Sequence, residues 1–261
     1  MSDDPVRLKH RHLERIAMAA LRMARLLTEC GARVRVSHQG ARLVVRGLGV
    51  ELLGIRTGYA SLEVTVSSGP NTITRMMTVG PHGVNHRLDS ALRALAVRIS
   101  EGGMTAELVE AEMDRVVRET PRHPVWIVSL AVGLACAAFG RLLGIDWAAF
   151  GPVLLAGAAG QWARQYLLRR GVNAYVVATV IAFAAASFAG FGARFAGSHT
   201  LNLAMMAAIL LLVPGVPATN AQTDIMEGYP VMGSARAVSV IMVMVFATTG
   251  VWLAEALLGV H

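Results

Sequence analysis

The residues best suited to chemistry lie together in the C-terminal half, in the stretch Leu210–Gly228. Pro214, Gly215 and Pro217 interrupt an apolar helix there, so the backbone groups around them lose their intrahelical partners. At membrane depth such a break persists only where protein buries it or where it lines a wet cavity, and transporters direct broken helix ends at their substrates. The stretch therefore predicts part of a substrate path. The alternative is a helix that ends at the membrane surface and turns.

Polar residues that follow the break are the candidates for binding and coupling. Asn220 and Asp224 are four residues apart and share one helix face, and an ionisable group near a bilayer is a functional candidate by default. Asp224 is predicted as a proton-coupling or gating group, and its alternative is an aspartate at the membrane interface that pairs with Arg236. Arg236, or Arg164 followed by Gln165, could bind a substrate carboxylate through the guanidinium fork, although Arg164 could also anchor its helix.

Signals for metal binding and covalent catalysis are weak. His82 and His86 are spaced as possible ligands, but the glycine and proline beside them indicate a turn, and no third ligand is near. Cys30 and Cys136 lie in different regions and form no recognisable pair. The chain has no glycine-rich phosphate-binding motif. We therefore expect no metal, no cofactor and no enzymatic activity.

Membrane helices must position these residues. The chain of 261 residues is 54% hydrophobic and only 16% charged, and its mean hydropathy is +0.52. Only ten charged residues lie in 125–261. A span needs roughly 20 mostly apolar residues to cross about 30 Å of hydrocarbon, and five candidates qualify: Val125–Leu143, Trp147–Leu168, Val172–Ala193, Leu201–Val213 and Ala237–Leu258.

Arginines beside the span ends predict the orientation. They favour the N-terminus inside and the C-terminus outside, because cytoplasmic loops carry an excess of basic residues. Small residues fill the third candidate span, which favours close helix contact over lipid exposure. The first 30 residues lack the apolar core of a secretory signal.

The N-terminal half predicts an α+β domain with its own core. Helices are expected at 6–29, 85–100 and 105–118, and five short alternating runs are expected as strands: Arg33–Ser37, Arg42–Arg46, Val50–Arg56, Ser61–Ser67 and Thr72–Val79. The net charge of +7 is spread over helices and strands without interleaved aromatic residues, so nucleic-acid binding is not expected.

The sequence also resembles the threonine/serine exporter family, and within it the short YjjP-type subunits. The resemblance rests on one long pattern: Leu211–Ala221, Asp224, Gly228, Gly233 and Arg236, with support from Pro121–Leu134, Arg164-Gln165 and Gly31-Ala32. It implies secondary export of small metabolites, threonine and serine in some members and dicarboxylates such as succinate in the two-subunit type. It also implies that a second small membrane subunit of five spans supplies the other half. One departure is that Arg33-Val-Arg35 stands where members commonly carry a glutamate.

Together these observations predict an α-helical membrane protein with five transmembrane helices (121–261), preceded by a cytoplasmic α+β domain (1–120). The expected function is that of one subunit of a proton-gradient-driven exporter in a bacterial inner membrane, with an amino acid or dicarboxylate as substrate. A homo-oligomer stays open. The alternatives are a scaffold subunit without its own pathway and a membrane-tethered enzyme.

Overall fold

The structure is a computed structural model that describes residues 10–259. Its contacts divide the chain into two compact units. Unit 1 holds the residues up to Arg122 together with Val216–Ala237, and unit 2 holds His123–Gly215 and the residues from Val238 onward. The segment Val216–Ala237 thus clusters with the N-terminal unit, although the sequence analysis assigns it to the membrane half.

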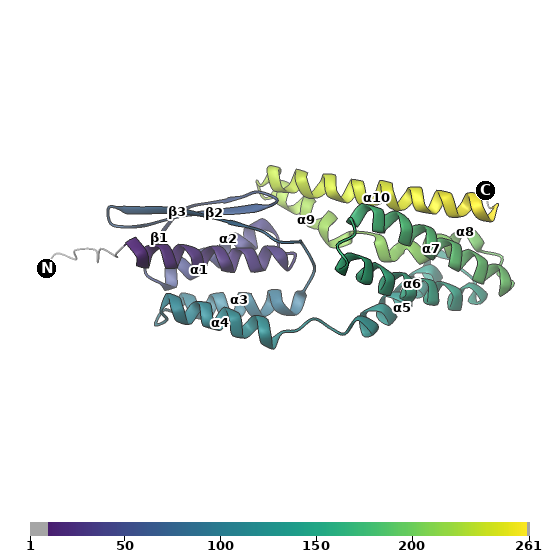
Figure 1. Cartoon of the computed structure of the whole chain (residues 1–261), viewed down its shortest axis with the longest axis horizontal. Coiled ribbons are helices and arrows are strands. Elements are labelled where there is room, and N and C mark those ends of the chain that lie inside the picture. Colours follow the sequence, from purple (N-terminus) through teal and green to yellow (C-terminus); the bar gives the residue numbers. More distant parts are fainter. Residues whose placement is uncertain (1–9, 260–261) are drawn as a thin grey trace. The chain divides into compact units, whose positions relative to one another are not determined.

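Unit 1 combines helices with a small antiparallel sheet (Figure 1). The strands β1 (Glu51–Thr57), β2 (Ser61–Ser68) and β3 (Asn71–Thr78) pair in chain order as a meander. The helices of the N-terminal part are α1 (His10–Glu29), α2 (Val34–Gly47), α3 (His86–Ser100) and α4 (Ala106–Glu119). Three predicted strands and three predicted helices are confirmed within these bounds, and residues 6–9 of the first predicted helix lie outside the described part.

The two strands predicted at Arg33–Ser37 and Arg42–Arg46 are wrong, because both runs belong to α2. Alternating valine and arginine suggested a period of two. The buried residues of α2, which are Val34, Ser37, Gly40, Ala41, Val44 and Val45, instead follow the three- and four-residue spacing of one helix face. That face packs against α1 and α3.

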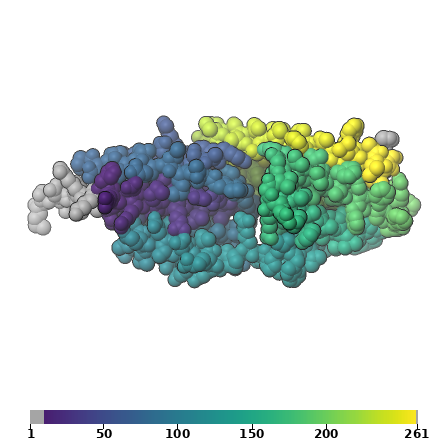
Figure 2. All heavy atoms as spheres, viewed as in Figure 1, coloured from purple at the N-terminus to yellow at the C-terminus, as the bar shows by residue number. Residues whose placement is uncertain are grey.

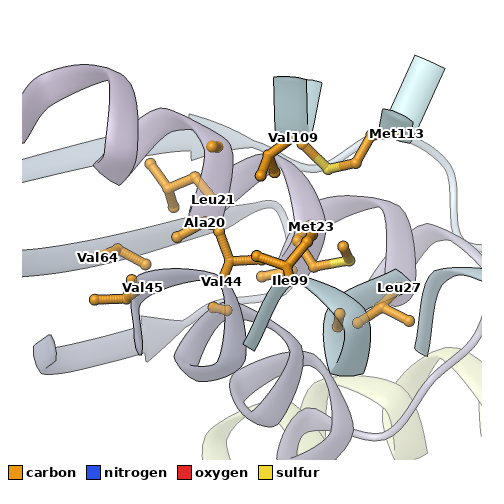
Figure 3. Close-up of a cluster of buried hydrophobic side chains, with 14 of the residues drawn as sticks. Ala20, Leu21, Met23, Leu27, Val44, Val45, Val64, Ile99, Val109 and Met113 are labelled. Carbon is orange, nitrogen blue, oxygen red and sulfur yellow. The ribbon is translucent and has the colours of Figure 1, made fainter. Parts of the chain in front are cut away.

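A hydrophobic core holds unit 1 together (Figure 3). Leu21 and Met23 from α1 meet Val44 from α2, Ile99 from α3 and Met113 from α4, and all five are fully buried. Burial of each large apolar side chain contributes roughly 1.5–3 kcal/mol before conformational entropy is subtracted. Because α1 and α2 are both packed into this core, the core holds the loop between them in place.

The remaining helices are mostly apolar. They are α5 (Val125–Leu143), α6 (Trp147–Arg169), α7 (Ala174–Phe195), α8 (Leu201–Ala208), the short 3-10 helix η1 (Ile209–Leu212), α9 (Gly215–Met226) and α10 (Pro230–Leu258). The predicted fourth span is therefore divided into α8 and η1, and the last helix begins seven residues earlier than predicted.

Within the described residues, three helices are long and apolar enough to cross a membrane: α5, α7 and α10. The number rises to four if Leu201–Leu212 and Gly215–Met226 form one broken span. The polar residues Gln161, Arg164 and Gln165 lower the hydropathy of α6. The count of five spans stays a prediction.

Small residues bring the helices of unit 2 close together. A Cβ atom on Gly133 of α5 would lie 2.4 Å from the carbonyl oxygen of Leu154 on α6. One on Gly250 of α10 would lie 2.3 Å from the carbonyl oxygen of Thr179 on α7. Half of the apolar window of α7 is buried, against 28% for α5, which agrees with its predicted role in helix contact. Side chains of α6 and α7 (green) also form part of the outer surface (Figure 2).

Substitution of Gly133 by alanine should destabilise unit 2 by about 1–3 kcal/mol, because the new methyl group would push α5 away from α6. Gly151→Ala on α6 is the matched control, since its Cβ would meet nothing within 4 Å. The control should be neutral or slightly stabilising. Melting temperatures of the purified chains in detergent would check this, and equal temperatures for the two variants would contradict the close approach.

Candidate functional site

A buried ion pair lies at the centre of the candidate site. Asp224 of α9 is fully buried, and Arg236 of α10 is 6% exposed. Arg236 Nη1 donates to Asp224 Oδ2, and the backbone N–H of Val34 donates to Asp224 Oδ1 at 2.9 Å. Both carboxylate oxygens therefore have partners. The ion pair between Asp224 and Arg236 that the alternative predicted is present, and it is buried within unit 1.

The loop between α1 and α2 completes this cluster. Arg236 Nη2 donates to the carbonyl oxygen of Ala32 at 2.9 Å, and Asn220 Nδ2 donates to that of Gly31 at 2.7 Å. Gly31 has a φ of +89°, and a Cβ there would lie 2.5 Å from the carbonyl oxygen of Gly83. Only glycine fits that position. We call the group formed by Gly31–Val34, Asn220, Asp224 and Arg236 the loop–helix cluster.

Tight packing of α9 on α10 positions the two charges. Gly228 ends α9 with a φ of +88°, as is common after a helix C-terminus. A Cβ on Gly233 would lie 2.8 Å from the carbonyl oxygen of Ala221. The two helices can therefore approach closely enough for Arg236 to reach Asp224. Both glycines belong to the pattern on which the resemblance rests.

Sequence reasoning missed a second acidic residue beside the cluster. Glu227 Oε1 lies 3.2 Å from Arg33 Nη1 and 3.9 Å from Arg35 Nη1. Glu227 Oε2 is buried and has no hydrogen-bond partner within residues 10–259. The only signal was the replacement of a common glutamate by Arg33-Val-Arg35, because nothing in the spacing links positions 194 residues apart.

A partly buried histidine packs near the cluster within unit 1. His38 of α2 shares a hydrogen bond of 2.7 Å between its Nε2 and Thr57 Oγ1. Its ring meets Tyr229 edge to face, with centroids 5.1 Å apart. Burial, assisted by the charge of Arg42, lowers the pKa of His38 to about 4. His38 is therefore neutral at physiological pH.

The other predicted residues divide between the units. Pro217 lies in the first turns of α9 in unit 1, whereas Pro214 and Gly215 lie at the break in unit 2. Arg164 and Gln165 lie on α6 in unit 2. The structure thus groups Asn220, Asp224 and Arg236 in one cluster, with the remaining residues outside it.

Polar atoms without partners mark α6 and the neighbouring α5. Gln161 Oε1, Gln165 Nε2 and Ser129 Oγ are buried and have no hydrogen-bond partner within the described range 10–259. Gln161 and Gln165 are one turn apart. Because α5 and α6 are antiparallel with Gly133 against Gly157, Ser129 and Gln161 lie one turn from that contact at the same level. Unpaired polar groups are costly in an apolar interior, and such groups are expected where a polar substrate passes.

The described residues contain no cluster of possible metal ligands. Across 10–259, no three histidine, cysteine, aspartate or glutamate residues come close enough together to hold an ion. Cys30 and Cys136 are both buried and free. The arrangement can bind and position polar groups.

The long apolar helices α5, α7 and α10 are typical of helical membrane proteins. The chain belongs to the ThrE family, described as putative threonine/serine exporters, whose family profile matches residues 18–258. Membership makes it a membrane transport protein, and the predicted resemblance is confirmed.

Two similar curated proteins are described as probable succinate transporter subunits, YjjP. The one from Escherichia coli K12 is 27% identical over 92% of this chain and 96% of its own length. The one from Klebsiella aerogenes is 24% identical over 94% and 95%. An uncharacterised protein of Haemophilus influenzae is 23% identical over 54% of this chain and 46% of its own length. No solved structure matches the chain.

Replacement of Asp224 by alanine should lower the free energy of unfolding of unit 1 by about 3–5 kcal/mol, because the guanidinium of Arg236 would stay buried without its partner. The double variant Asp224→Ala, Arg236→Met should recover much of this loss. Asp114→Ala, which removes a partly exposed pair with Arg22, is the control and should change the melting temperature much less. Equal effects of the two aspartate substitutions would contradict the burial of the pair.

Stability should fall as the pH drops from about 6.5 towards 4, since unfolded histidine takes up a proton near pH 6.5 and folded His38 only near 4. The unfolded state binds more protons in this window and is favoured by acid. Melting temperatures of the wild type and of His38→Gln, measured from pH 7.5 to 4, should show a weaker pH dependence for the variant. His123→Gln, at an exposed position, should follow the wild type. Parallel curves for wild type and His38→Gln would rule out the effect.

Proposed function

We propose that this chain is one subunit of a secondary exporter that moves a small carboxylate or hydroxy amino acid out of the cytoplasm, driven by the proton gradient. The observation that carries the proposal is the match to an exporter family over residues 18–258. The word "subunit" in the descriptions of both YjjP relatives supports a second protein. That partner is proposed to be a five-span membrane protein that supplies the complementary half.

The substrate path is proposed to run along α6 and the break before α9. Buried amide and hydroxyl groups without partners on α5 and α6 offer hydrogen bonds to a polar substrate that lipid cannot offer. The helix is interrupted at Pro214 and Gly215, with Pro217 just beyond, and transporters direct broken helix ends of this kind at their substrates. Asn220 follows on α9.

Arg164 is proposed as the group that binds the substrate carboxylate. It lies one position before Gln165 and three after Gln161, so the three residues occupy one side of α6. A guanidinium can bind a carboxylate through two parallel hydrogen bonds. Arg236 is less available for this role, because Asp224 and the carbonyl oxygen of Ala32 already occupy it.

Asp224 is proposed to control the path as a gate or as the proton-coupling group. In the structure its two oxygens are held by Arg236 and by the backbone N–H of Val34. Asp224 can exchange a proton with water only after this pair separates. A conformational change that opens the loop–helix cluster would thus couple proton movement to substrate movement.

The proposed location is a bacterial inner membrane, with the N-terminus cytoplasmic and the C-terminus periplasmic. Arg118 and Arg122 precede α5, and Arg169 and Arg170 end α6. Such basic residues favour the cytoplasmic side. Unit 1 would then lie in the cytoplasm.

Transport into inverted membrane vesicles tests these roles. Vesicles that carry this chain and the partner should take up threonine, serine or succinate under an imposed pH gradient, and vesicles with one subunit should not. Arg164→Gln should lower uptake about tenfold or more, because a charge-assisted hydrogen bond is lost. Asp224→Asn should abolish the pH dependence. Uptake is compared per amount of inserted protein.

The matched control is Arg169→Gln, an exposed arginine at the end of the same helix, which should transport normally. Normal pH-dependent uptake by Asp224→Asn would remove its coupling role. No uptake by the complete pair, with both proteins inserted, would favour a scaffold subunit instead.

A further inference from the structure

A cavity in unit 1 lies beside the loop–helix cluster. Its volume is about 180 Å³. It is lined by the loop after α1, by the start of α3 and by α9; the lining residues with chemistry are Cys30, Arg33, His86, Asp89, Arg93 and Asn220. Drug-sized ligands occupy pockets of roughly 300–1,000 Å³, so this cavity suits a smaller molecule.

Asp89 is the unexplained group in its wall. The residue is 8% exposed, and Asp89 Oδ2 pairs with Arg93 Nη2 at 2.8 Å. Asp89 Oδ1 is buried and has no hydrogen-bond partner within residues 10–259. The first turn of α3 stabilises its negative charge through the helix dipole. An ionised oxygen in such a place requires a donor, and none of the described residues supplies one.

The other residues that line the cavity indicate which kind of ligand could supply a hydrogen-bond donor to Asp89. Arg93 is half-exposed and keeps further N–H groups for an anion. Arg33 lines the cavity from the loop after α1; its Nη1 pairs with Glu227, and its other N–H groups serve the same purpose. Burial, and then the charge of Asp89, raise the pKa of Cys30 to about 11, so its sulfur stays a thiol. The cavity therefore offers one free acceptor beside two guanidinium groups, and it has no activated nucleophile.

We propose that this cavity binds a small zwitterion such as a free α-amino acid, with its ammonium on Asp89 Oδ1 and its carboxylate on Arg93 and Arg33. An ammonium supplies the missing donor and its charge matches the carboxylate. A dicarboxylate would leave Asp89 Oδ1 without a partner and bring a like charge to it. The lining residues all belong to unit 1. The cavity shares Asn220 with the proposed path, but the groups that hold the ammonium and the carboxylate here are different from Arg164, so it is a second site.

A ligand bound in this cavity would affect the Asp224–Arg236 pair, because both share the loop between α1 and α2. Gly31, Ala32 and Arg33 line the cavity, and the same loop accepts hydrogen bonds from Asn220 and Arg236. A ligand that fixes this loop therefore favours the arrangement in which Asp224 and Arg236 are paired. By linkage, any change that opens the pair weakens ligand binding by the same factor.

Isothermal titration of the full chain in detergent tests the site, with L-threonine, L-serine, glycine and succinate as probes. The amino acids should bind saturably and raise the melting temperature, and this binding should depend on Asp89, whereas any binding of succinate should not. Asp89→Asn should weaken amino-acid binding at least tenfold, because the amide oxygen carries no charge. Asp114→Asn, at a partly exposed ion pair between α1 and α4 and outside the cavity lining, should bind as the wild type does.

The outcomes separate this site from the transport path. Amino-acid binding that Asp89→Asn keeps and Arg164→Gln abolishes would belong to the proposed path on α6, contrary to the proposal. If Asp89→Asn proves unstable without ligand, Arg93→Gln replaces it and should also weaken binding. Amino-acid binding that is indifferent to both Asp89 and Arg93, or no binding at millimolar concentrations, would overturn the proposal. The titration needs neither partner nor gradient, so its failure is distinct from a failure of transport.

Discussion

The burial of two full charges, the carboxylate of Asp224 and the guanidinium of Arg236, is the constraint on which the rest of unit 1 depends. Removing both from water is costly, and their attraction offsets that cost only if their remaining hydrogen-bonding groups have partners. The backbone of Val34 and Ala32 provides them. The turn at Gly31 is needed to present these backbone groups. A buried pair of this kind specifies one arrangement of α9 and α10 against the loop more than it adds stability.

Unit 2 is held together by close packing of small apolar residues rather than by a buried ion pair. Its helices pack through glycine and alanine, which let backbones approach closely where water is absent. Polar groups are few, and those of Gln161, Gln165 and Ser129 have unpaired atoms within the described residues. The two regions thus treat polar groups differently: the loop–helix cluster gives both oxygens of Asp224 a partner, whereas α5 and α6 leave three buried polar atoms unpaired within the described residues. That difference is what separates a structural cluster from a path for a polar substrate.

Local patterns could predict most helices, because their signals lie within single segments. The sequence of α2 was wrongly predicted as two strands, because valine and arginine alternate at 33–37. The structure is decided instead by burial of one helix face against α1 and α3. The spacing of Asn220 and Asp224 correctly placed them on one helix face. It could not show that this face meets Gly31–Val34, about 190 residues earlier. Long-range contacts such as Arg33 with Glu227 leave no periodic trace in the sequence.

The helix α9 connects three features of the chain: the break at Pro214, the Asp89 cavity and the buried ion pair. It follows the break at Pro214, carries Asn220 into the wall of the Asp89 cavity, and buries Asp224 against Arg236. Because Asn220, Asp224 and Arg236 all bond to the same short loop, α9 cannot move by small steps without losing several hydrogen bonds together. Well-packed contacts of this kind tend to switch between discrete arrangements rather than deform continuously. The gating role proposed for Asp224 needs that behaviour, which here follows from how the backbone of Ala32 and Val34 satisfies one buried ion pair.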